Sequence, residues 1–327
     1  MFFPHLRLRR ARQSPWIREI LQEVSLRPAD LIYPIFIRDD HIAPSIPGLG
    51  ANRRYTLKEL PALIREVSSL GIKAVALFPM VDKSKRDETG SYACNPEGLI
   101  PQAISIIKKT TDQLGVITDV ALDPYTSHGQ DGLVKKGEIL NDETVAALQQ
   151  MSIVLAQAGS DIVAPSDMMD GRIGAIREAL DSKKFSNTMI LAYTAKYASS
   201  LYGPFREAVG SKGCLGVADK KTYQMSPDRR KEALLEANQD AREGADFLMV
   251  KPATLYQDII QNLTLTQKLP VFGYHVSGEY AMLISAHEAG FLDFGAALIE
   301  TLTSIKRAGA QAILTYGACE AARILNT

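Results

Sequence analysis

The chain has 327 residues, of which 46% are hydrophobic, and its 37 lysines and arginines balance its 37 aspartates and glutamates. This length fits either two ordinary domains or one large α/β barrel. A formal net charge of zero argues against a protein that binds nucleic acid mainly by electrostatic attraction, because such proteins carry a strong basic surplus.

Cysteine usage and hydropathy are typical of a cytoplasmic protein that does not contact the membrane. The three cysteines, Cys94, Cys214 and Cys319, are scattered and form no CxxC pair, which argues against a disulfide framework and a structural zinc knuckle. The longest apolar runs are far shorter than the roughly 20 residues that cross a bilayer. We therefore expect a cytoplasmic location, without a signal peptide.

The opening segment, residues 1–30, differs from the rest of the chain in charge and in proline content. Residues 6–12 read LRLRRAR, and no acidic residue follows these arginines before Glu19. One interpretation is an arm that binds nucleic acid or directs targeting. The interpretation that we favour is an extended arm that packs on a neighbouring subunit.

Short apolar runs rich in β-branched residues recur from residue 31 onward. Runs of unbroken rather than alternating apolar residues are typical of parallel strands that are buried on both faces. Eight strands are predicted, at residues 31–37, 73–79, 115–122, 161–167, 188–194, 246–252, 270–276 and 311–317.

Helical patterns fill the gaps between these runs. The segment 56–71 opens with a capping box, in which Thr56 is predicted to cap the helix and Glu59 to reach back to it. The segments 141–159 and 226–244 also carry helix-start signals and end at a glycine.

Strands that alternate with helices predict a (β/α)8 TIM barrel over residues 31–327, preceded by the arm of residues 1–30. A doubly wound open sheet is the alternative architecture. The sequence has no GxGxxG after the first predicted strand, which disfavours that alternative.

In such a barrel the active site lies at the C-terminal ends of the strands, where Lys251 is the most informative residue. It ends the apolar run DFLMVKP. Desolvation and a second ammonium group, from Lys196 at the end of the neighbouring strand, lower the pKa of a lysine. A neutral amine is the requirement for Schiff-base chemistry on a ketone. The alternative is a buried ion pair between Lys251 and an aspartate such as Asp119.

Two segments, LAYTAKYASSLYGPFREA (191–208) and GADFLMVKPATLY (244–256), closely resemble the lysine signatures of the porphobilinogen synthase family, also called delta-aminolevulinic acid dehydratases. The resemblance continues in order through DVALDPYTSHGQDG, APSDMMDGR, YQMSPDRR, YHVSGEYAM and SIKRAGA. It implies a TIM-barrel lyase of heme and other tetrapyrrole biosynthesis, which joins two 5-aminolevulinate molecules into porphobilinogen with loss of water. It also implies a homo-octamer in which the arms embrace neighbouring subunits.

The resemblance implies catalytic roles for both lysines. Lys251 would hold, as a Schiff base, the substrate that becomes the propionate side of the product, and Lys196 the one that becomes the acetate side. The carboxylates would be bound by two pairs of residues, Ser277 with Tyr316 and Arg206 with Lys221.

The loop at about residues 197–225 is long and rich in glycine, serine and lysine, which is typical of a functional segment. It is predicted to be a lid over the substrates, with a merely mobile insertion as the alternative. Lys221 in this loop is either a substrate ligand or a solvated lysine beside Lys220.

The metal chemistry departs from that of many family members, which bind a catalytic zinc ion with three cysteines in the third-strand segment. The matching positions here are Ala121, Asp123 and Asp131, so we expect no catalytic zinc. Asp123 and Asp131 match an aspartate-rich variant, in which they bind either a metal ion such as Mg²⁺ or water and the substrate amine. The resemblance further implies an allosteric Mg²⁺ site at Glu236.

Two other functions remain open at this point. A class I aldolase would need one reactive lysine and usually a phosphate-binding loop, whereas this sequence has two strand-end lysines and no clear loop of that kind. An inactive relative kept as an oligomeric scaffold is the second alternative. The presence of both lysines together with Arg206, Ser277 and Tyr316 argues against it.

Overall fold

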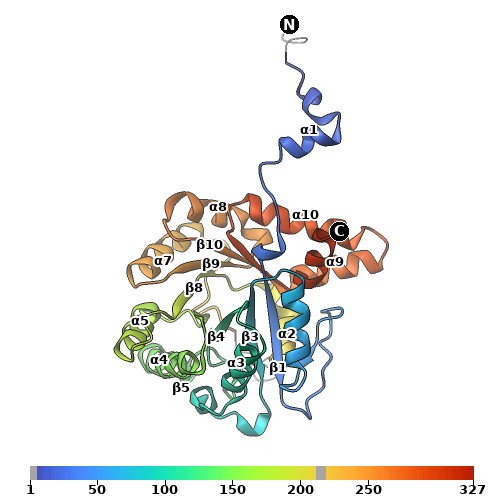
Figure 1. Ribbon diagram of the computed structural model, residues 1–327. Coiled ribbons are helices and arrows are strands. Elements are labelled where there is room, and N and C mark those ends of the chain that lie inside the picture. The colour runs from blue at the N-terminus through green and yellow to red at the C-terminus, as the bar shows by residue number, and fades with distance from the viewer. Residues whose placement is uncertain (1–5, 211–218) are drawn as a thin grey trace.

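The computed structural model describes residues 6–210 and 219–327, and over these ranges eight parallel strands form a closed barrel surrounded by helices (Figure 1). The last strand pairs with the first, with Leu31 opposite Ile313 and Ile32 opposite Leu314. The barrel strands are β1 (Leu31–Arg38), β3 (Ala74–Met80), β4 (Gly115–Val120), β7 (Ile162–Pro165), β8 (Met189–Lys196), β9 (Phe247–Lys251), β10 (Val271–His275) and β11 (Ala312–Thr315). The predicted (β/α)8 TIM barrel is confirmed, because β1 and β11 would not pair with each other in an open sheet.

Helices connect the strands and cover the outside of the barrel (Figure 1). None of the helices in the described part of the chain is long and apolar enough to cross a membrane. The helices between the strands are α2 (Leu60–Ser69), α3 (Leu99–Thr110), α4 (Asn141–Ala158), α5 (Arg172–Ser182), α6 (Gly203–Ala208), α7 (Arg230–Arg242), α8 (Gln257–Thr266), α9 (Ser277–Glu288) and α10 (Phe294–Arg307), and α11 (Ala318–Leu325) follows the last strand.

Helix starts are where the sequence-based boundaries differ most from the structure. Helix α2 begins at Leu60 rather than near Thr56, and the Glu59 carboxylate accepts hydrogen bonds from the backbone N–H and the hydroxyl of Thr56. Glu59 thus reaches back as predicted, but it closes a turn that precedes the helix. Helix α7 likewise begins at Arg230, four positions after Ser226.

Three short strands were not predicted, because none of them contains an apolar run. Strand β2 (Arg54–Tyr55) adds to the edge of β1. Strands β5 (Leu133–Lys135) and β6 (Glu138–Leu140) form an antiparallel hairpin in the connection between β4 and α4.

The core has two layers, because successive side chains of a strand point to opposite faces. Along β1, Ile32 and Phe36 point into the barrel and belong to its inner cluster. The other buried apolar residues of β1 pack against the helices: Leu31, Tyr33, Ile35 and Ile37. Burial on both faces explains why the barrel strands read as unbroken apolar runs.

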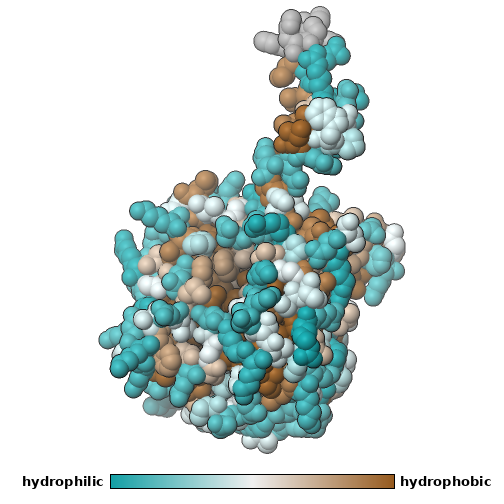
Figure 2. All heavy atoms as spheres, viewed as in Figure 1, coloured by the Kyte–Doolittle hydropathy of each residue, from teal (hydrophilic) through white to brown (hydrophobic). Residues whose placement is uncertain are grey.

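The described part of the predicted arm, residues 6–30, contains the short helix α1 (Pro15–Ile20), which lies away from the barrel (Figure 1). Apolar atoms lie along one side of it (Figure 2). The exposed large apolar residues of the arm are Leu6, Leu8, Trp16, Ile20 and Leu21. The contacts that we predict between this arm and a neighbouring subunit stay a prediction.

Candidate active site

Two lysines end neighbouring strands at the same rim of the barrel. Lys196 is the last residue of β8, Lys251 is the last residue of β9, and the two are partners in the register of this parallel pair. Residues paired in register point to the same face of a sheet, so both amines enter the barrel mouth. They line one small cavity together with Asp119, Asp123, Ser166, Tyr202, Phe205, Arg206, Lys220 and Gln224.

The Lys251 amine lies among aromatic rings. Burial, followed by the positive charge of Lys196, lowers the pKa of Lys251 to about 7, so that a large fraction of the amine is neutral near pH 7. Four ring centroids surround Lys251 Nζ, at 4.5 Å for Tyr274, 4.8 Å for Phe205, and 5.2 Å each for Tyr193 and Tyr202.

The alternative of a buried Lys251–Asp119 ion pair is not what the structure shows. Among the described residues, Lys251 makes no ion pair within 4.0 Å, and Asp119 Oδ1 is buried without a hydrogen-bond partner. Burial raises the pKa of Asp119 to about 7. Both groups therefore change protonation state near neutral pH, which suits general acid–base work beside a reacting amine.

Lys196 has polar surroundings instead of aromatic ones. Its Nζ donates hydrogen bonds to Asp131 Oδ2, at 3.1 Å, and to the carbonyl oxygen of Ser166. The two strand-end amines therefore differ in their neighbours, and the cavity offers two unlike positions to two identical molecules.

A third buried lysine, Lys220, lies in the same cavity, although no pattern in the sequence predicted a role for it. Its Nζ donates to Asp123 Oδ2 at 3.1 Å and to Asp131 Oδ1 at 2.6 Å. Burial opposes the charge of Lys220, but the two carboxylates outweigh burial and raise its pKa. Three lysines thus face three aspartates, Asp119, Asp123 and Asp131, and Arg206 adds a further positive charge to the cavity.

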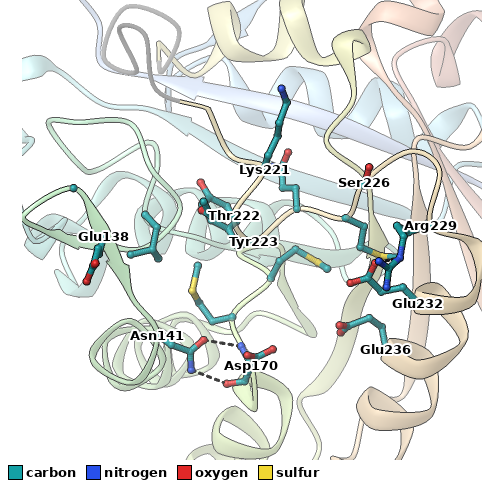
Figure 3. Close-up of a pocket in the computed structure, with 16 residues that line it drawn as sticks. Glu138, Asn141, Asp170, Lys221, Thr222, Tyr223, Ser226, Arg229, Glu232 and Glu236 are labelled. Atoms are coloured by element: carbon teal, nitrogen blue, oxygen red, sulfur yellow. Dashed lines mark hydrogen bonds and ion pairs between the residues drawn. The ribbon is translucent and has the colours of Figure 1, made fainter.

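The structure does not bring Lys221 into this cavity. Its side chain is 74% exposed and lies 3.4 Å from Asp219, whereas Lys220 is 5% exposed. In Figure 3, Lys221 points away from Glu232 and Glu236. Between two adjacent lysines on a loop, the sequence carried no periodic pattern that could show which one faces inward.

Ser277 and Tyr316 are both fully buried, and each forms a hydrogen bond with a residue whose ring lies beside the Lys251 amine. The Ser277 hydroxyl accepts a hydrogen bond from the Phe205 backbone N–H at 3.0 Å. The Tyr316 hydroxyl lies 3.0 Å from the hydroxyl of Tyr274. The two predicted carboxylate ligands thus adjoin Phe205 and Tyr274, whose rings contact the Lys251 amine.

The ends of the predicted lid, residues 197–225, are attached to the barrel. The Tyr202 hydroxyl donates to the carbonyl oxygens of Tyr197 and Lys251, at 2.7 and 3.1 Å, and the Met225 N–H donates to Lys196 O. Arg206, in α6, follows directly after this attached part and lines the cavity. Residues 211–218 lie outside the described residues, so the closing lid stays a prediction.

Asp123 and Asp131 do not fit a divalent metal ion as the structure arranges them. One oxygen of Asp123 and both oxygens of Asp131 accept hydrogen bonds from lysine amines. Within residues 6–210 and 219–327, no three His, Cys, Asp or Glu side chains are grouped so as to hold a metal ion.

Glu236 lies outside the barrel mouth, in a pocket between α7 and the segments around Asn141 and Asp170 (Figure 3). Burial is the main cause that raises the pKa of Glu236 to about 7, and nearby carboxylates, among them Asp170 and Glu232, add to it. Oxygen donors of this kind suit Mg²⁺, which keeps several waters and needs only one or two carboxylates. The pocket therefore fits the predicted ion by its donor chemistry.

Known proteins that resemble this chain in sequence and in structure belong to one enzyme family. A family model described as delta-aminolevulinic acid dehydratase matches residues 5–324. The delta-aminolevulinic acid dehydratase of Bradyrhizobium diazoefficiens is 48% identical over 98% of this chain and 91% of the relative, and that of Chlamydia pneumoniae is 47% identical over 95% and 94%. The crystal structure of the Toxoplasma gondii enzyme, in complex with the reaction product porphobilinogen, superposes with a TM-score of 0.95 at 47% identity over 98% of this chain and 91% of that one. The chain belongs to the delta-aminolevulinic acid dehydratase family.

Proposed function

We propose that this chain is a lyase that condenses two molecules of 5-aminolevulinate to porphobilinogen with loss of water. The observation that carries the proposal is the in-register pair of Lys196 and Lys251 in one buried cavity. One reactive lysine would suffice for an aldolase, whereas two unlike amines side by side match a reaction that holds two ketone substrates at once. Family membership supports the same reaction.

The lowered pKa of Lys251 makes this amine the first nucleophile. Its neutral form attacks the ketone of one substrate, and loss of water leaves an iminium group bonded to the lysine. The aromatic rings around Nζ exclude water from this carbon. Asp119 accepts or returns protons nearby, because its pKa of about 7 suits both directions at neutral pH.

Lys196 receives the second substrate beside the first. Asp131 and the Ser166 carbonyl hold its amine in place. Two substrates fixed on adjacent strand ends react as parts of one molecule, which removes much of the entropic cost of their encounter.

The substrate carboxylates need polar groups on both sides of the two amines. We propose Ser277 and Tyr316 for the substrate on Lys251, because both adjoin residues whose rings contact that amine. For the substrate on Lys196 we propose Arg206 with Lys220, since both line the cavity and Lys221 does not.

Chemical trapping tests this function directly. Incubation with 5-aminolevulinate and borohydride should leave a reduced adduct on Lys251, located by mass spectrometry of the digested protein. Lys251→Ala and Lys196→Ala should each abolish porphobilinogen formation, while Lys58→Ala, a change at an exposed lysine, should leave it intact. Wild-type protein that forms no porphobilinogen in the presence of Mg²⁺ would refute the proposal.

We also propose that Mg²⁺ binds at Glu236 and stimulates the enzyme from outside the barrel mouth, and that no zinc ion acts in catalysis. When bound, the ion would supply positive charge to the carboxylates of this pocket. Glu236→Gln should remove the stimulation by Mg²⁺ and leave the activity measured without Mg²⁺ unchanged. Glu288→Gln is the matched control, because Glu288 is an exposed helix glutamate.

A cytoplasmic homo-octamer is the assembly and location that we propose for this enzyme. The apolar side of the detached arm supports association with other copies of the chain. Light scattering gives the mass of the particle, and fractionation of the source cells gives its compartment.

A further inference from the structure

One buried carboxylate joins the segment that follows β9, the strand that ends at Lys251, to the segment that follows the neighbouring strand β10. Glu279, the third residue of α9, is only 2% exposed. Its Oε2 accepts a hydrogen bond from the backbone N–H of Val276 at 2.7 Å, and its Oε1 accepts one from the backbone N–H of Thr254 at 2.8 Å. Both oxygens are therefore bonded to backbone, in two different segments.

Each of these segments carries a residue of the proposed site. Thr254 follows Lys251 by three positions on the segment after β9, and Val276 immediately precedes Ser277 at the start of α9. The Glu279 carboxylate thus ties the chain next to the reactive amine to the chain next to the proposed carboxylate ligand.

Capping of α9 alone would not require a charged side chain at position 279, because glutamine at the third position of a helix also completes a capping box. Among the described residues, no lysine, arginine or histidine forms an ion pair with Glu279, and burial raises its pKa to about 7. A buried carboxylate without a counter-ion is unfavourable. Two charge-assisted bonds to backbone N–H groups offset part of this cost. The ionised carboxylate is an acceptor at both oxygens, whereas a glutamine would point an NH₂ group at one of the two N–H donors.

We propose that Glu279 is a positioning residue that fixes the separation between Lys251 Nζ and the Ser277 hydroxyl. This inference rests on the proposed function. A keto acid bonded to Lys251 must place its carboxylate at Ser277, so the separation selects the number of carbons between ketone and carboxylate. Fixed spacing lets the two contacts form together without further loss of entropy.

The experiment compares two ketones that differ in the carboxylate. 4-Oxopentanoate carries the ketone and the carboxylate of the substrate, and 2-butanone carries a ketone alone. Borohydride trapping on Lys251, quantified by mass spectrometry over a concentration series, gives the half-saturating concentration of each. In the wild-type protein 4-oxopentanoate should be favoured strongly, because it alone makes the second contact.

Glu279→Gln should raise the half-saturating concentration of 4-oxopentanoate by about tenfold, which corresponds to one good hydrogen bond to a charged group. The half-saturating concentration of 2-butanone should not change. Damage to the fold would instead raise the half-saturating concentrations of both ketones. Glu288→Gln, at an exposed glutamate of the same helix, should leave both values unchanged.

Ser277→Ala separates a spacing role from a direct one. If Glu279 acts through Ser277, the double variant should lose little more preference for 4-oxopentanoate than Ser277→Ala alone. An unchanged ratio of the two half-saturating concentrations in Glu279→Gln, or additive losses in the double variant, would overturn the inference.

If Glu279→Gln does not fold, the same ratio is measured in Glu279→Asp, whose shorter side chain cannot span both N–H groups. An unchanged ratio there has the same meaning. Wild-type protein that traps no keto acid on Lys251 would refute the proposed function instead.

Discussion

At the scale of single residues, the cavity gives chemically identical groups unlike surroundings. Lys251 Nζ lies among aromatic rings, whereas Lys196 Nζ donates to a carboxylate and a carbonyl. Because the two substrate molecules are the same, the protein must supply the asymmetry of the product. The neighbours of the two amines provide it.

The lowered pKa of Lys251 predicts the pH dependence of the first step. The amine attacks only when neutral, and its neutral fraction rises as pH increases through about 7. We therefore expect kcat/KM, which reports the free enzyme, to rise from about pH 5.5 to about pH 8 with an inflection near 7. Lys221→Ala should keep this inflection, and a profile that is flat across this range would contradict the assignment.

The adjacent lysines 220 and 221 should respond in opposite ways to the same change. Lys220→Met leaves Asp123 and Asp131 short of a buried counter-charge, which costs roughly 3–5 kcal/mol of stability for a broken buried pair. Lys221→Met alters an exposed residue and should change the free energy of unfolding by less than about 0.5 kcal/mol.

Urea unfolding gives the free energy of unfolding of both variants, and the rate of porphobilinogen formation gives their activity. Activity should be lost only in Lys220→Met. Equal loss of activity in the two variants would restore the role that the sequence resemblance implied for Lys221.

At the scale of elements, the site depends on how closely the segment 200–206 packs against α9. This segment supplies Tyr202, Phe205 and Arg206 to the cavity, and Ser277 bonds its backbone at two points. Gly278 allows the close approach, because a Cβ there would lie 2.5 Å from the carbonyl oxygen of Leu201.

Gly278→Ala should therefore displace the segment 200–206 and reduce kcat/KM by at least about tenfold, through misplaced ligands rather than lost ones. Gly203→Ala is a matched control on the packed segment itself, because nothing lies within 4 Å of a Cβ at that position. Steady-state kinetics on both variants test this, and a fully active Gly278→Ala enzyme would show that the segment adjusts freely.

Elements with long apolar runs could be predicted from the sequence, and contacts between loops could not. All eight barrel strands were predicted within one residue of their observed starts and two of their observed ends, because burial on both faces leaves a continuous apolar signal. The starts of α2 and α7 were placed three residues early, because a capping pattern can also close a turn before a helix. Lys220 was missed because its burial depends on carboxylates 97 and 89 positions away in the chain.

At the scale of the whole molecule, the arm and the barrel have different roles. The described arm residues leave Trp16, Ile20 and Leu21 exposed, while the barrel buries its apolar residues in two layers. An apolar surface of this kind on a detached segment is expected to be covered by another copy of the chain.

Removal of residues 1–22 should therefore yield a smaller oligomer with the barrel intact, since the first residue of the arm that joins the core is Leu26. Light scattering measures the particle mass, and circular dichroism measures the helix content. Trp16→Glu should act in the same direction, and Glu23→Gln should have no effect. An unchanged particle mass after truncation would exclude the arm from assembly.

The pairing of β11 with β1 sets a condition on how the enzyme is made. Synthesis proceeds from the N-terminus, so β1 is made first, and the part of its edge at Leu31 and Ile32 stays unpaired until Ala312–Thr315 has left the ribosome. Tyr316 follows β11 immediately. A nascent chain can thus hold Lys196 and Lys251 but neither a closed barrel nor its last proposed substrate ligand. Catalysis therefore requires β11 to be in place, and until then this open edge of β1 is a surface with which other chains can mispair.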